Sequence, residues 1–438
     1  MKSRLWRPLL DGNLAVRAWG AVNAVAQALE VWSPGNPHEY HPESWLDRVV
    51  SLGGGAAGQA LFHGYLFKAE GAERHAARAQ QLLNQAVESL AMAPAHPALY
   101  SGFTGVAWAA EHLGRLLNGE EEQAAGEDED AGEEIDQALL TALDRFSWAG
   151  DYDLISGLVG FGVYALERFP RRSAVRCLEA IVDRLDESAE RNGQEVTWFR
   201  PPEVLPGAVR EHTPHGYYDL GVAHGVPGII ALLADACRLE VRQDRARPLL
   251  DGAVRWLALQ PLASRKGACF PSRIGPGIEA TPSRLAWCYG DPGIAATLLY
   301  AARAVGVKEW EDRALAIAAH AASAAPEDAG VRDMGLCHGA LGLAHLYNRI
   351  YQAGGDELFA DAARLWYRLG LEMHKPEGGG GAGIEARVAG QDSQSLWAAD
   401  PGFLTGAAGI GLALLAAVTP VEPEWDHLLL VAIPPRET

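Results

Sequence analysis

Seven short glycine turns recur along this chain of 438 residues, and they constrain its fold more than any other feature. Each turn has the pattern Gly-x-x-Gly and is followed at once by an apolar run rich in Ala and Leu. The first glycines lie 47 to 68 residues apart, a spacing that suits a helical hairpin with its loops. The turns are at residues 55–58, 102–105, 157–160, 225–228, 290–293, 339–342 and 406–409.

The segments around these turns predict two layers of helices. The runs after the turns are apolar nearly all round, as in buried helices, whereas stretches such as 74–83 and 310–317 carry charges on one face. Glycine at both ends of a turn lets the chain tighten and approach a neighbour closely. Two or three such turns would fit chance in a chain with 49 glycines, but seven that each open an apolar run do not.

The predicted fold class is therefore all-α, an α/α toroid in which seven outer helices surround seven inner ones. We expect one domain over residues 1–438. All seven inner helices then begin at the same end of the barrel. Side chains in or just before the turns should converge there, although they are far apart in the sequence.

Three segments fall outside the repeat. Residues 119–134 are rich in Glu and Asp and are predicted to form a flexible acidic loop. Residues 377–383, five of which are glycine, are predicted to be a flexible connector. Residues 193–223 combine a short β-rich stretch with several prolines, which predicts a small β-containing insertion, placed as a flap before His224.

Composition limits the partners and the compartment. The chain has 37 basic and 56 acidic residues, a formal charge of -19, which disfavours a nucleic-acid backbone as partner. Its N-terminus lacks the apolar run of a signal peptide, and no stretch approaches the roughly 18 apolar residues of a membrane span. The five cysteines are odd in number and scattered, which is not a disulfide framework and predicts a cytoplasmic protein.

Three residues stand out as metal ligands because they directly precede turns at equivalent repeat positions: Cys288, Cys337 and His338. Two thiolates and an imidazole suit Zn²⁺, and three protein ligands with an open fourth position are typical of a catalytic zinc site. The sequence therefore predicts one Zn²⁺ per chain. A lone cysteine in a helical protein is usually a small apolar residue. This is the interpretation for Cys177 and Cys237, and Cys269 is expected to be inert.

Four more residues are candidates for the chemistry. His224 also precedes its turn, and a neutral imidazole near a metal is a natural acid or base. Asp153 is either the partner that orients His224 or a helix N-cap. Arg284 either stabilises a developing anion or pairs with the acidic surface, and Trp287 either walls the pocket or fills the core. The helical histidines His63, His112 and His345 are expected to be ordinary helix residues.

The motifs Ala-His-Gly-x-x-Gly at 223–228, Trp-Cys-Tyr-Gly-x-Pro-Gly at 287–293 and Cys-His-Gly-x-x-Gly at 337–342 resemble those of the LanC-like lanthionine synthetases. The repeat of turns extends the resemblance over nearly the whole chain, and the length is similar to that of a stand-alone lanthipeptide cyclase. One departure is Pro227, where the family pattern leads us to expect a small residue.

The resemblance implies a toroid with zinc held by Cys288, Cys337 and His338. It implies catalytic roles for His224, Asp153, Arg284 and Trp287. The substrate would be a dehydrated precursor peptide, whose cysteine thiolates add to dehydroalanine or dehydrobutyrine to give lanthionine or methyllanthionine rings. A dehydratase and an exporter are further partners that the resemblance suggests.

Other classes of protein remain open at this point. A LanC-like protein that binds thiols such as glutathione, or serves as a scaffold without cyclase activity, would share the same motifs. Prenyltransferase β-subunits share the toroid and also activate a thiol on zinc, but nothing in the chain calls for their partner subunit. Toroidal glycosidases need paired carboxylates, whereas these turns offer thiols and imidazoles.

Overall fold

The structure is a computed structural model that describes residues 6–32, 49–90, 96–118, 130, 132–144, 150–263, 267–375, 386–389 and 395–435. It divides into two compact units, Met1–Gly132 with Arg332–Trp425, and Glu133–Val331 with Asp426–Thr438. Each unit joins segments that are distant in the sequence. The expectation of a single domain stays a prediction.

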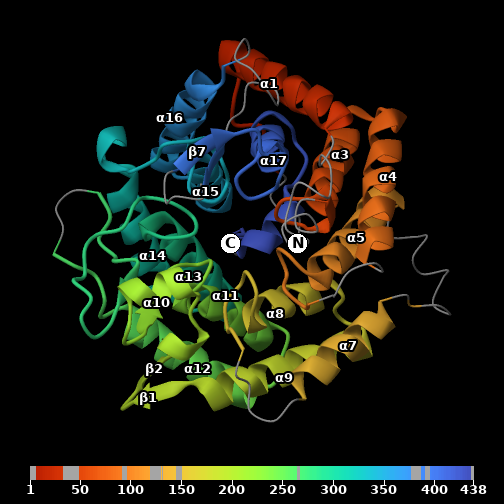
Figure 1. Cartoon of the computed structure of the whole chain (residues 1–438). Helices are drawn as coiled ribbons and strands as arrows, with labels where there is room; N and C mark the ends of the chain where they lie inside the picture. The colour runs from red at the N-terminus through yellow and green to blue at the C-terminus, as the bar shows by residue number, and fades with distance from the viewer. Residues whose placement is uncertain are drawn as a thin grey trace. The chain divides into compact units, whose positions relative to one another are not determined.

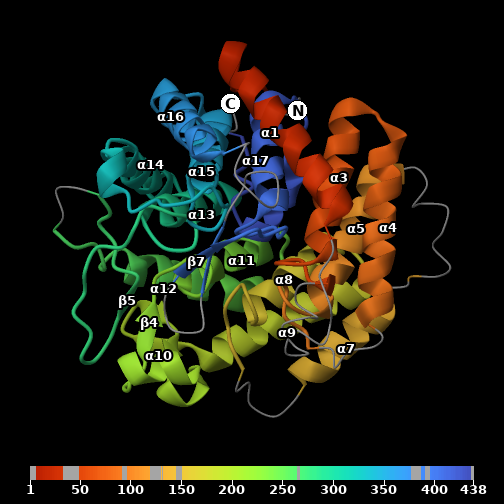
Figure 2. The ribbon, with the colours of Figure 1, turned by 45° about the horizontal axis from the view of Figure 1, so that its top comes forward.

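The first unit pairs buried helices with amphipathic ones. α3 packs on α4 and α15 packs on α16, and Figure 2 shows α3, α4 and α5 side by side. α17 packs between α15 and α3 and is covered by α1 (Figure 1). The helices of this unit are α1 (Gly12–Val31), α3 (Ala56–Glu70), α4 (Glu73–Leu90), α5 (Phe103–Asn118), α15 (Ala340–Gly354), α16 (Glu357–Met373) and α17 (Ala407–Val418). A two-stranded antiparallel sheet joins β6 (Ala386–Ala389) to β7 (Ser395–Ala398).

The second unit repeats the arrangement with three further inner helices. α11 contacts both α8 and α13, and each of the three is backed by an outer helix, α9, α12 or α14. The helices are α7 (Glu133–Leu143), α8 (Leu158–Glu167), α9 (Arg172–Ser188), α10 (Gly207–His212), α11 (Val226–Arg238), α12 (Gln243–Leu257), α13 (Asp291–Val305) and α14 (Lys308–Ala322). The outer helix α9 buries one stripe only, whereas every residue of α11 from Val226 to Cys237 is buried.

All seven glycine turns lead into an inner helix, as the sequence predicts. The first glycine of each turn directly precedes the first helical residue of α3, α5, α8, α11, α13, α15 or α17. The second glycine is required by a close approach in six of the turns, because a Cβ there would lie 1.8 to 2.6 Å from the carbonyl oxygen six residues earlier. Those six glycines are Gly58, Gly105, Gly228, Gly293, Gly342 and Gly409. Each loop is thereby folded down onto the start of its own helix.

Hydrogen bonds between neighbouring turns tie the loops together within each unit. In the first unit, the Gly53 N–H donates to the Tyr100 carbonyl, the Phe403 N–H to the Gly53 carbonyl and the Cys337 N–H to the Leu404 carbonyl. The last turn of the chain is therefore bonded to the first. In the second unit, the Leu154 N–H donates to the carbonyl of Ala223.

The predicted insertion at 193–223 does contain β structure. β1 (Glu190–Asn192) pairs with β2 (Glu195–Thr197), and a second sheet has the order β3-β4-β5. This three-stranded sheet joins β3 (Phe199–Arg200), β4 (Tyr217–Asp219) and β5 (Arg273–Ile274), all antiparallel. β4 ends five residues before His224, so the sheet leads directly into the fourth turn.

Two other predictions concern segments outside the repeat. α7 begins at Glu133, so the last two residues of the predicted acidic loop 119–134 are helical. Most of that loop and the connector at 377–383 lie outside the described residues. Among the helices that the structure describes, none combines the length and the apolar character that a membrane crossing needs.

Candidate metal centre and acid–base pair

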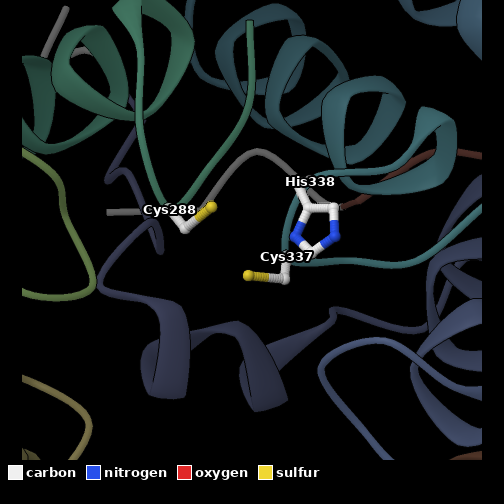
Figure 3. Close-up of side chains that lie close together, drawn as sticks. All are labelled: Cys288, Cys337 and His338. Atoms are coloured by element: carbon white, nitrogen blue, oxygen red, sulfur yellow. The ribbon is translucent and has the colours of Figure 1, made fainter. Parts of the chain in front are cut away.

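Cys288, Cys337 and His338 form a group of candidate metal ligands. Each offers one ligand atom, and these atoms all lie within 4.8 Å of one another (Figure 3). Cys288 is 5 % exposed, whereas Cys337 and His338 are half-buried. Ligands of a tetrahedral Zn²⁺, with Zn–S near 2.3 Å and Zn–N near 2.0 Å, are separated by roughly 3.8 Å. Two thiols and an imidazole within 4.8 Å of one another are a donor set that suits Zn²⁺.

An aspartate orients the histidine of this group. Asp333 is 5 % exposed, and one of its carboxylate oxygens accepts the N–H of Gly335 at 3.0 Å. Its other oxygen lies 3.5 Å from Nε2 of His338. Histidines that bind a metal commonly direct their second nitrogen at a carboxylate. Nε2 of His338 therefore faces a carboxylate, and Nδ1 is the nitrogen that would bind a metal.

The turn before α13 fixes Cys288. Gly290 has φ +120°, a region that L side chains rarely adopt, and a Cβ at Gly293 would lie 2.2 Å from the Trp287 carbonyl oxygen. Pro292 fits in the first turn of α13, where a missing N–H costs no helical hydrogen bond. Pro227, the departure from the family pattern, has the same place in α11. It removes no hydrogen bond from that helix.

His224 and Asp153 form a close pair within the second unit. Nδ1 of His224 lies 2.5 Å from Oδ2 of Asp153, which is 1 % exposed. Burial opposes the charged imidazole, but the hydrogen bond and charge of Asp153 raise the pKa of His224 above its usual value. Burial likewise opposes the charged carboxylate, but His224, the Ser156 N–H and Arg200 hold the pKa of Asp153 below its usual value. Of its two predicted roles, the geometry favours Asp153 as the partner of His224, since the N-cap of α8 is Gly157.

Tyr289 and Asp219 extend this pair, and the sequence prediction missed both. The Tyr289 ring stacks with the His224 ring at 6.3 Å between centroids, and its hydroxyl donates to Asp219 at 2.9 Å. Asp219 is fully buried, and its other oxygen accepts the Gly221 N–H. Burial raises the pKa of Asp219, with His224 acting in the opposite direction. Because Tyr289 directly follows Cys288, it links the metal ligand to the acid–base pair inside one unit.

The remaining predicted site residues differ in their surroundings. Trp287 is 1 % exposed, and its indole N–H donates to the Leu429 carbonyl at 2.8 Å, which favours the core-filling role. Arg284 is exposed at the entrance to the fifth turn, and its predicted role toward an anion stays a prediction. Cys177 and Cys237 are buried in α9 and α11, where burial raises the pKa of each thiol, to about 12 and about 11. Both are therefore unreactive core residues.

The helical histidines lie in buried aromatic clusters, as expected of ordinary helix residues. His63 in α3 stacks with His75, and burial followed by the charges of His75 and Arg78 lowers its pKa to about 3. His112 in α5 stacks on Trp108, and His345 in α15 stacks on Trp425. Neither belongs to the group of metal ligands.

Comparison with known proteins defines the class. The sequence model of the family described as "Lanthionine synthetase C-like protein" matches residues 48–430, so the chain belongs to that family. The nisin biosynthesis protein NisC of Lactococcus lactis subsp. lactis is 24 % identical over 303 residues, which are 65 % of this chain and 70 % of that protein. The solved structure of nisin cyclase covers 94 % of this chain and 97 % of its own, with a TM-score of 0.70 at 20 % identity. This likeness confirms the predicted fold class, the α/α toroid.

Proposed function

We propose that this chain is a zinc-dependent lanthipeptide cyclase. It would add the cysteine thiolates of a dehydrated precursor peptide to dehydroalanine or dehydrobutyrine, forming lanthionine or methyllanthionine rings. The observation that carries the proposal is the Cys288, Cys337 and His338 group, whose ligand atoms lie within 4.8 Å of one another. Membership of the lanthionine synthetase C-like family supports it.

The three ligands determine what the site offers to a thiol. A bound Zn²⁺ would lower the pKa of a substrate thiol so that it is presented as a thiolate at neutral pH. Cys288 and Cys337 would contribute negative charge, so the substrate sulfur stays nucleophilic. Asp333 keeps the His338 ring aimed by facing its Nε2.

We assign to His224 the proton donation that completes the addition. When the sulfur bonds to the β-carbon, the electron pair of the double bond moves to an enolate, whose α-carbon must then take up a proton. Nδ1 of His224 is held by Asp153, so Nε2 is the nitrogen that would donate the proton. The hydrogen bond and charge of Asp153 raise the pKa of His224, and this direction favours the protonated imidazole that a general acid needs. In this scheme Arg284 helps to hold the enolate oxygen.

The names of the relatives support the proposed substrate class. One is named for nisin biosynthesis and another as the nisin cyclase, so a peptide with dehydrated residues and cysteines is the substrate we propose here. A dehydratase and an exporter are its proposed partners. The five cysteines form no disulfide, and we place the reaction in the reducing cytoplasm.

The test measures ring formation directly. A dehydrated lanthipeptide precursor is incubated with the purified protein and then alkylated, because cyclisation itself leaves the peptide mass unchanged. Alkylation adds mass at each thiol that remains, so we expect fewer adducts with time. Cys288→Ala, Cys337→Ala and His338→Ala should each lose both bound zinc and this protection.

Cys269→Ala is the matched control, because it removes a half-buried thiol outside the turns. It should keep zinc and ring formation. Full cyclisation by a zinc-free variant would refute the mechanism. Zinc binding with unchanged peptide thiols would instead favour a thiol-binding or scaffold protein.

A further inference from the structure

Arg200 lies at the centre of the contacts behind His224. It ends β3, is 6 % exposed, and pairs across the sheet with Tyr217 of β4. Its Nη2 donates to Asp151 at 2.6 Å, and its Nη1 lies 3.3 Å from Oδ2 of Asp153. The same Nη1 lies 3.4 Å from the His224 carbonyl oxygen. One buried guanidinium therefore touches both turns that supply the acid–base pair.

The oxygen that Arg200 contacts is the one that His224 uses. Oδ2 of Asp153 accepts from both Arg200 and Nδ1 of His224, while Oδ1 accepts the Ser156 N–H at 2.8 Å. Both oxygens of the Asp153 carboxylate therefore accept hydrogen bonds, each from its own partners. The His224 ring takes its direction from a carboxylate that cannot rotate without breaking these contacts.

Charge balance gives Arg200 a second effect. Asp151 and Asp153 belong to the same loop, and burial followed by the charge of Asp153 raises the pKa of Asp151 to about 6, while Arg200 lowers it. Asp153 is buried and Asp151 is half-buried, and like charges so close together disfavour ionisation of both carboxyls unless a cation lies beside them. With Arg200 between them, Asp153 stays ionised for His224.

We propose that Arg200 is the positioning residue that holds the Asp153 carboxylate against His224, and that the β3-β4-β5 sheet serves to deliver it. The same sheet also supplies Asp219 at the end of β4, which accepts the hydroxyl of Tyr289, the residue whose ring stacks with His224. The catalytic part of this inference rests on the proposed function of His224. The structural part, the fixed hydrogen bond between His224 and Asp153, does not.

The test compares Arg200→Gln and Arg200→Lys with Arg273→Gln as the matched control. Arg273 belongs to the same sheet, but its guanidinium lies over the Tyr217 ring, 4.7 Å from the centroid. With ¹⁵N-labelled histidine, the Nδ1–H signal of His224 is assigned by its loss in His224→Asn. We expect Arg200→Gln to lose the strongly downfield position of that signal while zinc content is retained.

The kinetic readout is a split between kcat and KM for ring formation. A misplacement of about 1 Å in a catalytic group lowers the rate by on the order of 100-fold, so kcat should fall by that factor in Arg200→Gln with KM little changed. Arg200→Lys keeps the charge but has one nitrogen for two carboxylates, and should give an intermediate kcat. Arg273→Gln should match the wild type in both readouts.

The outcomes separate the two proposals. If Arg200→Gln keeps the downfield signal and the wild-type kcat, the positioning role is wrong, whatever the substrate. If Arg200→Gln does not fold, the same criterion applies to Arg200→Lys. If the signal is lost but the wild type forms no rings, the positioning role stands and the proposed function fails.

Discussion

The glycine turn before α13 makes a strong prediction about Cys288, tested by Gly293→Ala. The added Cβ would lie 2.2 Å from the carbonyl oxygen of Trp287 and 3.0 Å from Cγ2 of Val222, whereas ordinary contact begins at 3.4 Å. The loop and the helix must therefore separate by roughly 1 Å, since neither neighbour is the end of a long flexible side chain. Overpacking of this kind costs about 1–3 kcal/mol of stability.

The same movement should weaken metal binding, because the displaced carbonyl belongs to the residue before Cys288. Loss of the support around a metal ligand lowers affinity by about 10- to 100-fold, and we expect Gly293→Ala to bind zinc more weakly by that factor. Competition with a chromophoric chelator measures the affinity, and tryptophan fluorescence during heating measures stability.

Gly20→Ala is the control for this substitution. Gly20 is exposed in α1, and an added Cβ would have no atom within 4 Å. Alanine there should stabilise the helix by about 0.5–1 kcal/mol and leave zinc affinity unchanged. Wild-type zinc affinity in Gly293→Ala would refute the idea that the glycine pair sets the position of Cys288.

Two further substitutions test the second unit. Asp136→Ala removes the buried carboxylate that pairs with Arg168 at 3.0 Å. It should lower the free energy of unfolding by about 3–5 kcal/mol and leave the zinc content unchanged. A much smaller loss of stability would contradict the importance of this ion pair. Asp153→Asn removes the partner that raises the pKa of His224, so that pKa should fall in an NMR titration. The stabilisation from this pair is complete between the ordinary pKa values of the two groups, 3.8 for Asp153 and 6.5 for His224; it is lost as the pH falls from 3.8 through the lowered pKa of Asp153, or rises from 6.5 through the raised pKa of His224. In Asp153→Asn, the free energy of unfolding should vary less with pH on both the acidic and the alkaline side of this window. An unchanged pH dependence of unfolding would argue against the pair.

The starts of the inner helices could be predicted because their cause is local. A second glycine is needed wherever a loop folds back onto its own helix, and the clash of a Cβ with the carbonyl six residues earlier leaves little choice of residue. That Cys288, Cys337 and His338 lie close together was predictable for the same reason, since they keep fixed offsets from these glycines. Their position in the repeat distinguished these residues from the other cysteines and histidines, whereas residue type alone did not.

Arg200 and the role of Trp287 were beyond sequence reasoning for physical reasons. Arg200 reaches Asp151 from 49 residues away, and only the pairing of β3 with β4 brings it there. Strands of two or three residues leave no periodicity to recognise. Trp287 suited a pocket wall and a core equally well, because the choice depends on Leu429, near the other end of the chain.

A signal that the sequence did contain is an aspartate six residues before the first glycine of four turns: Asp151, Asp219, Asp333 and Asp400. In the last three, one carboxylate oxygen accepts the N–H two residues on, which caps the loop. The other oxygen then meets a different group in each turn, namely Tyr289, His338 or Thr405. The hydrogen bond to the backbone N–H shapes the loop in all three turns, whereas the partner of the other carboxylate oxygen differs from turn to turn. In two of these turns, the carboxylate that holds the loop also contacts a residue of the candidate site. A substitution of Asp219 or Asp333 would therefore disturb both the loop and the site.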